Sequence, residues 1–170
     1  MATPLIEFKN VTFKYHAQAE PTLHDVSFQI FPGEKVLIAG ASGSGKTTLS
    51  HLLTGFLMPD AGDIRLDGQS VLGQSIKTRA EQVGYVLQNP NHMITKSTVF
   101  DEVASGLVLR QVEPAEIEQK VRSVLRLLDL DGMRNWPIGA LSFGQKKRVT
   151  IAAVLVLSPQ ILILDEPTAG

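Results

Sequence analysis

An eight-residue glycine-rich segment constrains this chain more than any other feature. Residues 40–47 read G-x-x-x-x-G-K-T, after an apolar run at 35–40 and before a stretch with helical character. Glycine permits the backbone conformations in which a loop wraps a phosphate with its N–H groups pointing inward. The following helix presents the positive end of its dipole to the same anion. The pattern therefore predicts a strand, a phosphate-binding loop and a helix in succession.

Two side chains at the end of this segment complete the expected chemistry. Lys46 is expected to reach the terminal phosphates, and the Thr47 hydroxyl is placed to bind Mg²⁺. The alternative is a glycine-rich turn that carries a solvated lysine. At average residue usage this pattern arises by chance in about one chain of this length in 150, so we favour the phosphate-binding interpretation.

A pair of acidic residues follows an apolar segment further along the chain. Residues 161–164 read ILIL, which predicts a buried strand, and they lead directly into Asp165 and Glu166. Ligand sites in open α/β sheets lie at the carboxyl ends of strands. Asp165 is therefore expected to hold Mg²⁺, directly or through water, and Glu166 to orient or deprotonate an attacking water. The alternative is a solvated acidic turn, which the presence of a phosphate loop makes the weaker interpretation.

The periodicity of apolar residues predicts strands and helices that alternate at both ends of the chain around a helical insert. Strands are expected at 6–15 with a break at Asn10, and at 26–30, 35–40, 63–66, 83–87 and 161–164. Helices are expected from the phosphate loop to Gly55, from Val99, from Pro114 and over 143–157, with Thr98 and Ser142 as N-caps. This order predicts an α/β fold with a mostly parallel sheet.

Composition excludes several classes of protein. Hydrophobic residues make up 44% of the 170 residues and the formal net charge is −1, which is not typical of a disordered chain. The near-neutral balance predicts that nucleic acid is not a partner. Because there is no cysteine, disulfides and cysteine–zinc sites are excluded. The apolar stretches predict neither a signal peptide nor a membrane span, which needs about 18 residues.

A short segment between these motifs points to a family. Residues 141–145 read LSFGQ and end 20 residues before Asp165. Alone they indicate a capped helix start. The phosphate loop, LSxGQ and LILDEPTAG in this order resemble the ATP-binding-cassette (ABC) ATPases, and the resemblance covers residues 15–170. It implies a P-loop NTPase core with a mostly parallel sheet, an N-terminal antiparallel β subdomain and an α-helical signature subdomain.

The resemblance implies ATP and Mg²⁺ as cofactors and a two-subunit nucleotide site. Tyr15 matches the aromatic residue that stacks on adenine, and the LSxGQ signature closes on the γ-phosphate of ATP held by the opposite subunit. Phe143 departs from the commoner glycine of the signature, which affects close packing against the nucleotide. The implied nucleotide-binding residues are Tyr15, Gly40, Ala41, Ser42, Gly43, Ser44, Gly45, Lys46, Thr47, Thr48, Ser142, Gly144 and Gln145.

The same resemblance implies the catalytic and metal-binding residues. Gln88 matches the glutamine that contacts Mg²⁺ and the attacking water and couples the site to a membrane partner. The implied catalytic residues are therefore Glu166 and Gln88, and the implied metal ligands are Thr47, Gln88 and Asp165. For Gln88 the alternative is a polar loop residue before a proline.

Three local features resemble the ATPases of energy-coupling-factor importers, which serve vitamins and metal ions. They are the segment after Gln88, the stretch that follows the signature, and the short loop before Pro21. The implied partners are a second ABC ATPase domain, in a homodimer, in a heterodimer or in the same chain, and a transmembrane coupling protein. The implied location is the cytoplasmic face of the membrane, bound peripherally. The alternatives are a soluble ABC ATPase of DNA repair or translation and a nucleotide-binding module without turnover.

We expect a single ABC ATPase domain over residues 1–170. Its β subdomain and nucleotide-binding core are expected at about 1–90 and 158–170, and its helical subdomain at about 91–157. The family pattern continues with an aspartate and a switch histidine, whereas all four histidines here precede Asp165. We therefore expect a chain truncated after the Walker B motif, which by itself hydrolyses ATP weakly or not at all.

Overall fold

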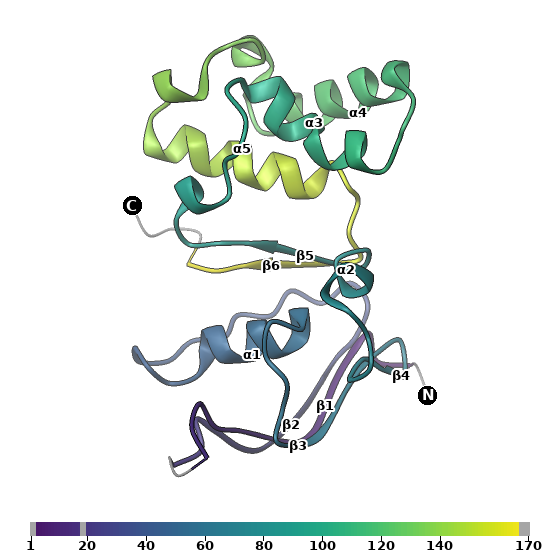
Figure 1. The fold of residues 1–170 in the computed structure, drawn as a ribbon, viewed down its shortest axis with the longest axis vertical. Coiled ribbons are helices and arrows are strands. Elements are labelled where there is room, and N and C mark those ends of the chain that lie inside the picture. The colour runs from purple at the N-terminus through teal and green to yellow at the C-terminus, as the bar shows by residue number, and fades with distance from the viewer. Residues whose placement is uncertain (1–2, 18–19, 167–170) are drawn as a thin grey trace. The chain divides into compact units, whose positions relative to one another are not determined.

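The computed structural model describes residues 3–17 and 20–166 (Figure 1). The chain divides into two compact units, Met1–Glu81 and Gln82–Gly170, which we call the N-unit and the C-unit. Within the described residues, every helix is too short or too polar to cross a bilayer. The expected class, with an antiparallel sheet, parallel strands and a helical segment, is confirmed.

The N-unit is built on an antiparallel sheet of four strands in the order β2-β1-β3-β4. The strands are β1 (Ile6–Phe13), β2 (Leu23–Ile30), β3 (Ala61–Leu66) and β4 (Gln69–Ser70). The break expected at Asn10 is present, because the β1–β2 register shifts between Phe8 and Val11 and Asn10 has a φ of 49°. Asp67 and Gly68 form the two-residue turn between β3 and β4, both with positive φ, as this turn type requires.

The helix after the phosphate loop is α1 (Lys46–Thr54), and it ends at Gly55 in the left-handed conformation. A buried guanidinium stabilises this end. Arg79, at the end of the short helix α2 (Ile76–Arg79), is 1% exposed. Its Nη1 donates to the carbonyl of Leu52 at 2.8 Å, and its Nη2 donates to the carbonyl of Val71 at 2.6 Å. A cation near the last carbonyls of a helix is favoured by the helix dipole.

The residues between β2 and the phosphate loop do not form the strand predicted at 35–40. The structure assigns no regular element there, and Val36, Leu37 and Ile38 are exposed, Leu37 by 88%. A strand exists only where its backbone groups pair with a neighbour, and no ladder of the described residues includes this segment. An apolar segment alone does not predict whether such a neighbouring strand is present.

The C-unit combines two parallel strands with three main helices. Strands β5 (Val83–Val86) and β6 (Ile161–Leu164) pair in parallel, from Val83 opposite Ile161 to Val86 opposite Leu164. The helices are α3 (Val99–Leu109), α4 (Pro114–Leu127) and α5 (Phe143–Leu155), and three short 3₁₀ helices lie between elements, η1 (Pro90–His92), η2 (Asp131–Met133) and η3 (Ile138–Ala140). Figure 1 shows α5 lying between the two strands and helices α3 and α4.

Helix starts in the C-unit follow their sequence signals. Thr98 caps α3 by accepting a hydrogen bond from the Asp101 amide, and Pro114 occupies the first turn of α4. Ser142 caps α5 in a capping box with Gln145. The faces of these helices enclose one core, whose buried members are Val99, Val103, Ala104, Leu107, Ile117, Val121, Leu125, Leu130, Ile138, Leu141, Val149, Ala152 and Val156.

Strand β6 is less buried than its apolar sequence predicts. Ile161 is buried, whereas Leu162 and Leu164 are exposed by 38% and 40%. The reason is that β6 pairs with β5 alone among the described residues, so part of its surface is uncovered. Under α5 the packing is close, because a Cβ added to Gly84 of β5 would meet the side chains of Val154 and Pro159.

The contacts of Arg79 lead to a stability prediction. We expect Arg79→Met to lower the free energy of unfolding by about 3 kcal/mol, because the Leu52 and Val71 carbonyls would lose their charged donor while remaining buried. Lys77→Met is the matched control, since Lys77 is exposed on the same helix. Urea denaturation of both variants measures the difference, and equal midpoints would contradict the assigned role of Arg79.

Candidate functional site

The predicted phosphate loop has the backbone conformations that its glycines were expected to supply. Gly43 and Gly45 have φ of 80° and 92°, which other residues rarely adopt. A Cβ on Gly45 would also lie 2.8 Å from Leu23 Cδ2 and 3.3 Å from the Thr22 carbonyl oxygen, so a larger residue would have to displace its neighbours. In the described structure no side chain caps the start of α1, which leaves its first N–H groups for a ligand.

Lys46, the first residue of α1, folds back over the loop. Its Nζ donates to the carbonyls of Gly40 and Ala41 at 2.9 and 2.8 Å. The ammonium group therefore lies at the loop itself, beside the uncapped start of α1. Thr47 is exposed next to it. This arrangement fits an anionic phosphate, since it combines a cation with helix N–H donors and has no acidic residue in the first turn.

Tyr15 contacts the same helix. Its hydroxyl lies 3.0 Å from the Thr48 hydroxyl, and its ring meets the Phe13 ring edge to face at a centroid distance of 5.0 Å. Tyr15 is 54% exposed, so its ring remains accessible. Thr48 is buried, which makes it a support for Tyr15 and α1 in this structure.

In the C-unit, the chain folds so that Gln88 and Glu166 meet. Gln88 follows β5 and Glu166 follows β6, so parallel pairing brings both to the carboxyl end of the sheet. The Gln88 amide Nε2 donates to Glu166 Oε2 at 2.6 Å. Both residues are exposed, so the carboxylate is oriented by the amide and remains open to water.

Asp165 is half-buried beside them and is held by a phenol. Tyr85 of β5 donates its hydroxyl proton to Asp165 Oδ2 at 2.9 Å. Burial, and then this hydrogen bond and the negative charge of Asp165, raise the pKa of Tyr85 well above its ordinary value. A hydrogen bond that orients a carboxylate in this way is typical of residues around a metal ligand.

The signature residues form the start of α5. The Ser142 amide donates to Gln145 Oε1 at 2.8 Å, and the Gln145 amide donates to Ser142 Oγ at 3.3 Å. Gly144 is exposed, and a Cβ there would meet nothing within 4 Å. Phe143 is 42% exposed at the same end of the helix. The capping box therefore fixes an exposed helix terminus.

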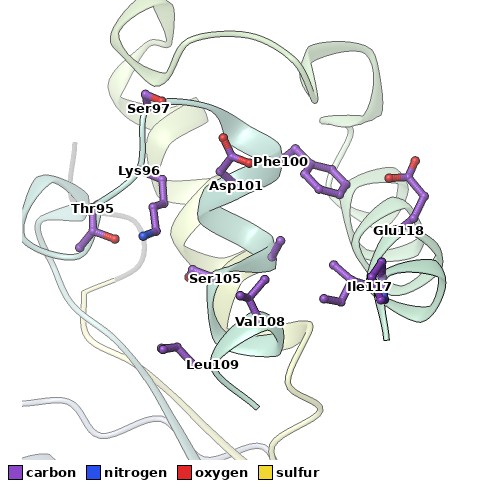
Figure 2. A pocket seen from close by; sticks show the side chains of 12 residues that line it. Thr95, Lys96, Ser97, Phe100, Asp101, Ser105, Val108, Leu109, Ile117 and Glu118 are labelled. Carbon is purple, nitrogen blue, oxygen red and sulfur yellow. The ribbon is translucent and has the colours of Figure 1, made fainter. Parts of the chain in front are cut away.

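A groove between α3 and α4 lies in the same unit. Its volume is about 770 Å³. Figure 2 shows Phe100 and Val108 of α3 facing Ile117 of α4, with Lys96 and Thr95 at one end of the groove. Glu102 is buried behind this end and accepts hydrogen bonds from the Thr95 and Lys96 amides at 2.8 and 2.7 Å. It thereby holds the backbone at Thr95 and Lys96, within the segment that runs from Gln88 to α3.

Comparison with known proteins identifies the family. The family model described as ABC transporter matches residues 23–169. The chain belongs to the ABC transporter family. This confirms the resemblance based on the phosphate loop, LSFGQ and the Asp165-Glu166 pair.

Individual members of the ABC transporter family are close in sequence and in structure. An ABC transporter ATP-binding protein of Lactiplantibacillus plantarum is 53% identical over 167 residues, and one of Enterococcus faecalis is 53% identical over 166 residues. Each match covers 98% of this chain and 29% of the relative, so the chain spans less than a third of the length of these curated relatives. The solved structure of cbiO1 from Clostridium perfringens, described as part of the ABC transporter complex cbiONQ, aligns with a TM-score of 0.91 at 34% identity, over 99% of this chain and 67% of cbiO1.

The predicted ABC site residues divide between the units. Tyr15 and residues 40–48 lie in the N-unit, and Gln88, residues 142–145 and residues 165–166 lie in the C-unit. Within each unit the structure joins Tyr15 to Thr48, Lys46 to the loop, and Gln88 to Glu166. The described residues contain no cluster of three His, Cys, Asp or Glu side chains that could hold a metal ion.

Sequence reasoning missed three polar residues around the site. Tyr85 orients Asp165, Glu102 fixes the segment after Gln88, and Lys147 contacts the backbone of Glu166. Lys147 stands between the basic residues Lys146 and Arg148, yet it is only 7% exposed. Lys147 lies three residues before Thr150 and seven before Val154. This helical spacing is the signal that could have predicted its position on the inner face of α5.

Proposed function

We propose that this chain is an ATP-binding and ATP-hydrolysing part of an ABC transporter. The observation that carries the proposal is the hydrogen bond between Gln88 and Glu166, in a family member that also has a preshaped phosphate loop. This pair gives the chain a carboxylate that is both oriented and open to water. Family membership alone supports nucleotide binding, and the pair supports turnover.

The N-unit would bind the nucleotide through its loop and helix. Lys46 would transfer its hydrogen bonds from the Gly40 and Ala41 carbonyls to the terminal phosphate oxygens, and the first N–H groups of α1 would donate to the same group. Tyr15 would offer its ring to the adenine, and its hydroxyl contact with Thr48 would set the ring in place.

The ligands proposed for Mg²⁺ are Thr47, Gln88 and Asp165, all of them oxygen donors as this ion prefers. Bound Mg²⁺ neutralises charge on the phosphate oxygens. The Tyr85 hydroxyl would hold Asp165 in a single orientation for this role. Mg²⁺ is usually held by one or two carboxylates together with phosphate oxygens and waters, so the absence of an acidic cluster among the described residues fits this donor set.

Glu166 would act as the general base. Gln88 Nε2 already donates a hydrogen bond to Glu166 Oε2. We therefore propose that Oε1 accepts the proton of the attacking water. A positioned base typically contributes about 10²–10⁴-fold to a rate. The signature residues Ser142, Gly144 and Gln145 would donate to the γ-phosphate held by a second ABC ATPase domain, because they form an exposed, capped helix start.

We further propose that the groove between α3 and α4 receives a transmembrane partner. Its apolar floor of Phe100, Val108 and Ile117 fits an amphipathic helix, which is bound in such grooves through its apolar face. Glu102 ties one end of the groove to the segment after Gln88, so an occupant would act on the catalytic glutamine. The similar cbiO1 is described as part of a transporter complex. The transporter is proposed to be an energy-coupling-factor importer of a vitamin, a vitamin precursor or a metal ion, with this chain peripheral at the cytoplasmic face of the membrane.

Replacement of Lys46 tests nucleotide binding. In the protein at its full encoded length, Lys46→Ala should weaken MgATP binding by about 10- to 100-fold, because charge-assisted hydrogen bonds to phosphate are lost. Lys35→Ala, at an exposed position of the N-unit, is the matched control. Titration with a fluorescent ATP analogue measures both variants, and unchanged affinity in Lys46→Ala would remove the phosphate-loop assignment.

Replacement of Glu166 tests catalysis. Glu166→Gln in the full-length protein should lower kcat by about 10²–10⁴-fold and retain ATP binding, so that an ATP-bound dimer accumulates. Glu113→Gln, at an exposed glutamate before α4, is the control. Phosphate release and size-exclusion chromatography measure turnover and dimer. Wild-type turnover in Glu166→Gln would mean that another group is the base.

The groove assignment is tested by a charge in its floor. Val108→Glu should reduce co-purification of the transmembrane partner, because a carboxylate would have to be desolvated against the apolar face of the bound helix. Leu127→Glu, at a 72% exposed position of α4, is the control. Pull-down from detergent-solubilised membranes measures the retained partner. Equal recovery with both variants would place the partner elsewhere.

A further inference from the structure

Lys147 is a buried cation that the proposed mechanism does not use. It lies in α5, two residues after Gln145, and is 7% exposed. Taking an ammonium group out of water is costly, so buried lysines are rare unless they are paired. In this structure its Nζ donates to the backbone carbonyl of Glu166 at 2.7 Å.

The backbone that Lys147 contacts is in an unusual conformation. Glu166 has a φ of 45°, and residues other than glycine seldom adopt this left-handed region. Such a conformation persists only where the surroundings hold it. The ammonium group of Lys147 supplies one of these contacts, on the carbonyl of the same residue.

Glu166 is consequently held at two points. Gln88 Nε2 binds its carboxylate, and Lys147 Nζ binds its main chain. The two contacts come from different elements, the loop after β5 and the helix α5. A side chain that leaves a fixed backbone and ends in a fixed carboxylate has little freedom to move.

The second contact also belongs to the helix that begins with the signature. Ser142 and Gln145 form the capping box of α5, and Lys147 lies in the next turn. Because an α-helix is a rigid element with a rise of about 1.5 Å per residue, the capped end and Lys147 move together.

We propose that Lys147 is a positioning residue for Glu166, through which the signature helix sets the place of the catalytic carboxylate. The inference rests on the proposed function, since it concerns the same base. Lys147 acts through its hydrogen bond to the Glu166 carbonyl of the same chain. Lys147 would not touch the nucleotide or the attacking water.

The test compares two neighbouring lysines in the full-length protein with its co-purified subunits. Lys147→Met keeps a chain of similar length without a donor, and Lys147→Arg restores a cationic donor. Lys146→Met is the matched control, since Lys146 is partly exposed and its Nζ lies 3.4 Å from Asn91 Oδ1. For each variant, kcat, the KM for ATP, the affinity for a fluorescent ATP analogue and the melting temperature are measured.

We expect Lys147→Met to lower kcat by about 10- to 100-fold, the loss that follows when a catalytic group shifts by about 1 Å. The KM and the affinity should stay within about twofold, because the ground-state contacts to ATP are unchanged. Lys147→Arg should recover most of kcat, and Lys146→Met should resemble the wild type. Where Lys147→Met is not recovered folded, Lys147→Gln, which retains a shorter donor, is compared with Lys146→Gln.

Three results would overturn the inference. The first is a wild-type kcat in Lys147→Met. The second is an equal loss of kcat, affinity and melting temperature, which would indicate a structural role only. The third is a Lys147→Arg variant no more active than Lys147→Met. Failure of the proposed function is distinguishable, because it would show as unchanged MgATP affinity in Lys46→Ala or as wild-type turnover in Glu166→Gln.

Discussion

The packing of α5 against α3 is the interaction on which the C-unit depends. Val149, Ala152 and Val156 contribute buried side chains from α5 and its C-cap, and Val103 and Leu107 contribute them from α3. This contact fixes the axis of α5, and so it determines where the capped signature lies at one end. The same axis places Lys147 beside Glu166, two residues after the end of β6. The burial of apolar side chains thus determines where the polar groups lie, because these groups have no strong preference of their own for one position.

Among the described residues, the buried cations Arg79 and Lys147 both donate hydrogen bonds to backbone carbonyls. Arg79 donates to Leu52 and Val71, and Lys147 donates to Glu166. Desolvation lowers the pKa of Arg79, which reflects the cost of its burial. A carbonyl partner offsets part of this cost without adding a second charge to desolvate. Each cation connects segments that are separated in the sequence. Each therefore stabilises a contact that the pattern of neighbouring residues does not predict.

The sequence predicts well those features that depend on nearby residues. The caps at Thr98 and Ser142 and the end of α1 at Gly55 rest on contacts a few residues apart, and they occur as expected. The strand predicted at 35–40 is not formed, because a strand depends on a partner strand elsewhere in the chain. The meeting of Gln88 with Glu166 depends on the parallel pairing of β5 with β6, which no residue near either of them specifies. The contrast between Lys146 and Lys147 could not be predicted by residue type, because only the rotation of α5 about its axis distinguishes them.

The close approach of α5 to β5 at Gly84 has a mechanical consequence. With Val154 and Pro159 filling the place of a side chain, the helix and the strand have no layer between them that could absorb a displacement. Helix α3 packs on α5 in turn, so a push on α3 is carried through α5 to the strand that ends near Gln88. Close packing of this kind leaves little room for α5 to shift on β5 without moving the strand as well.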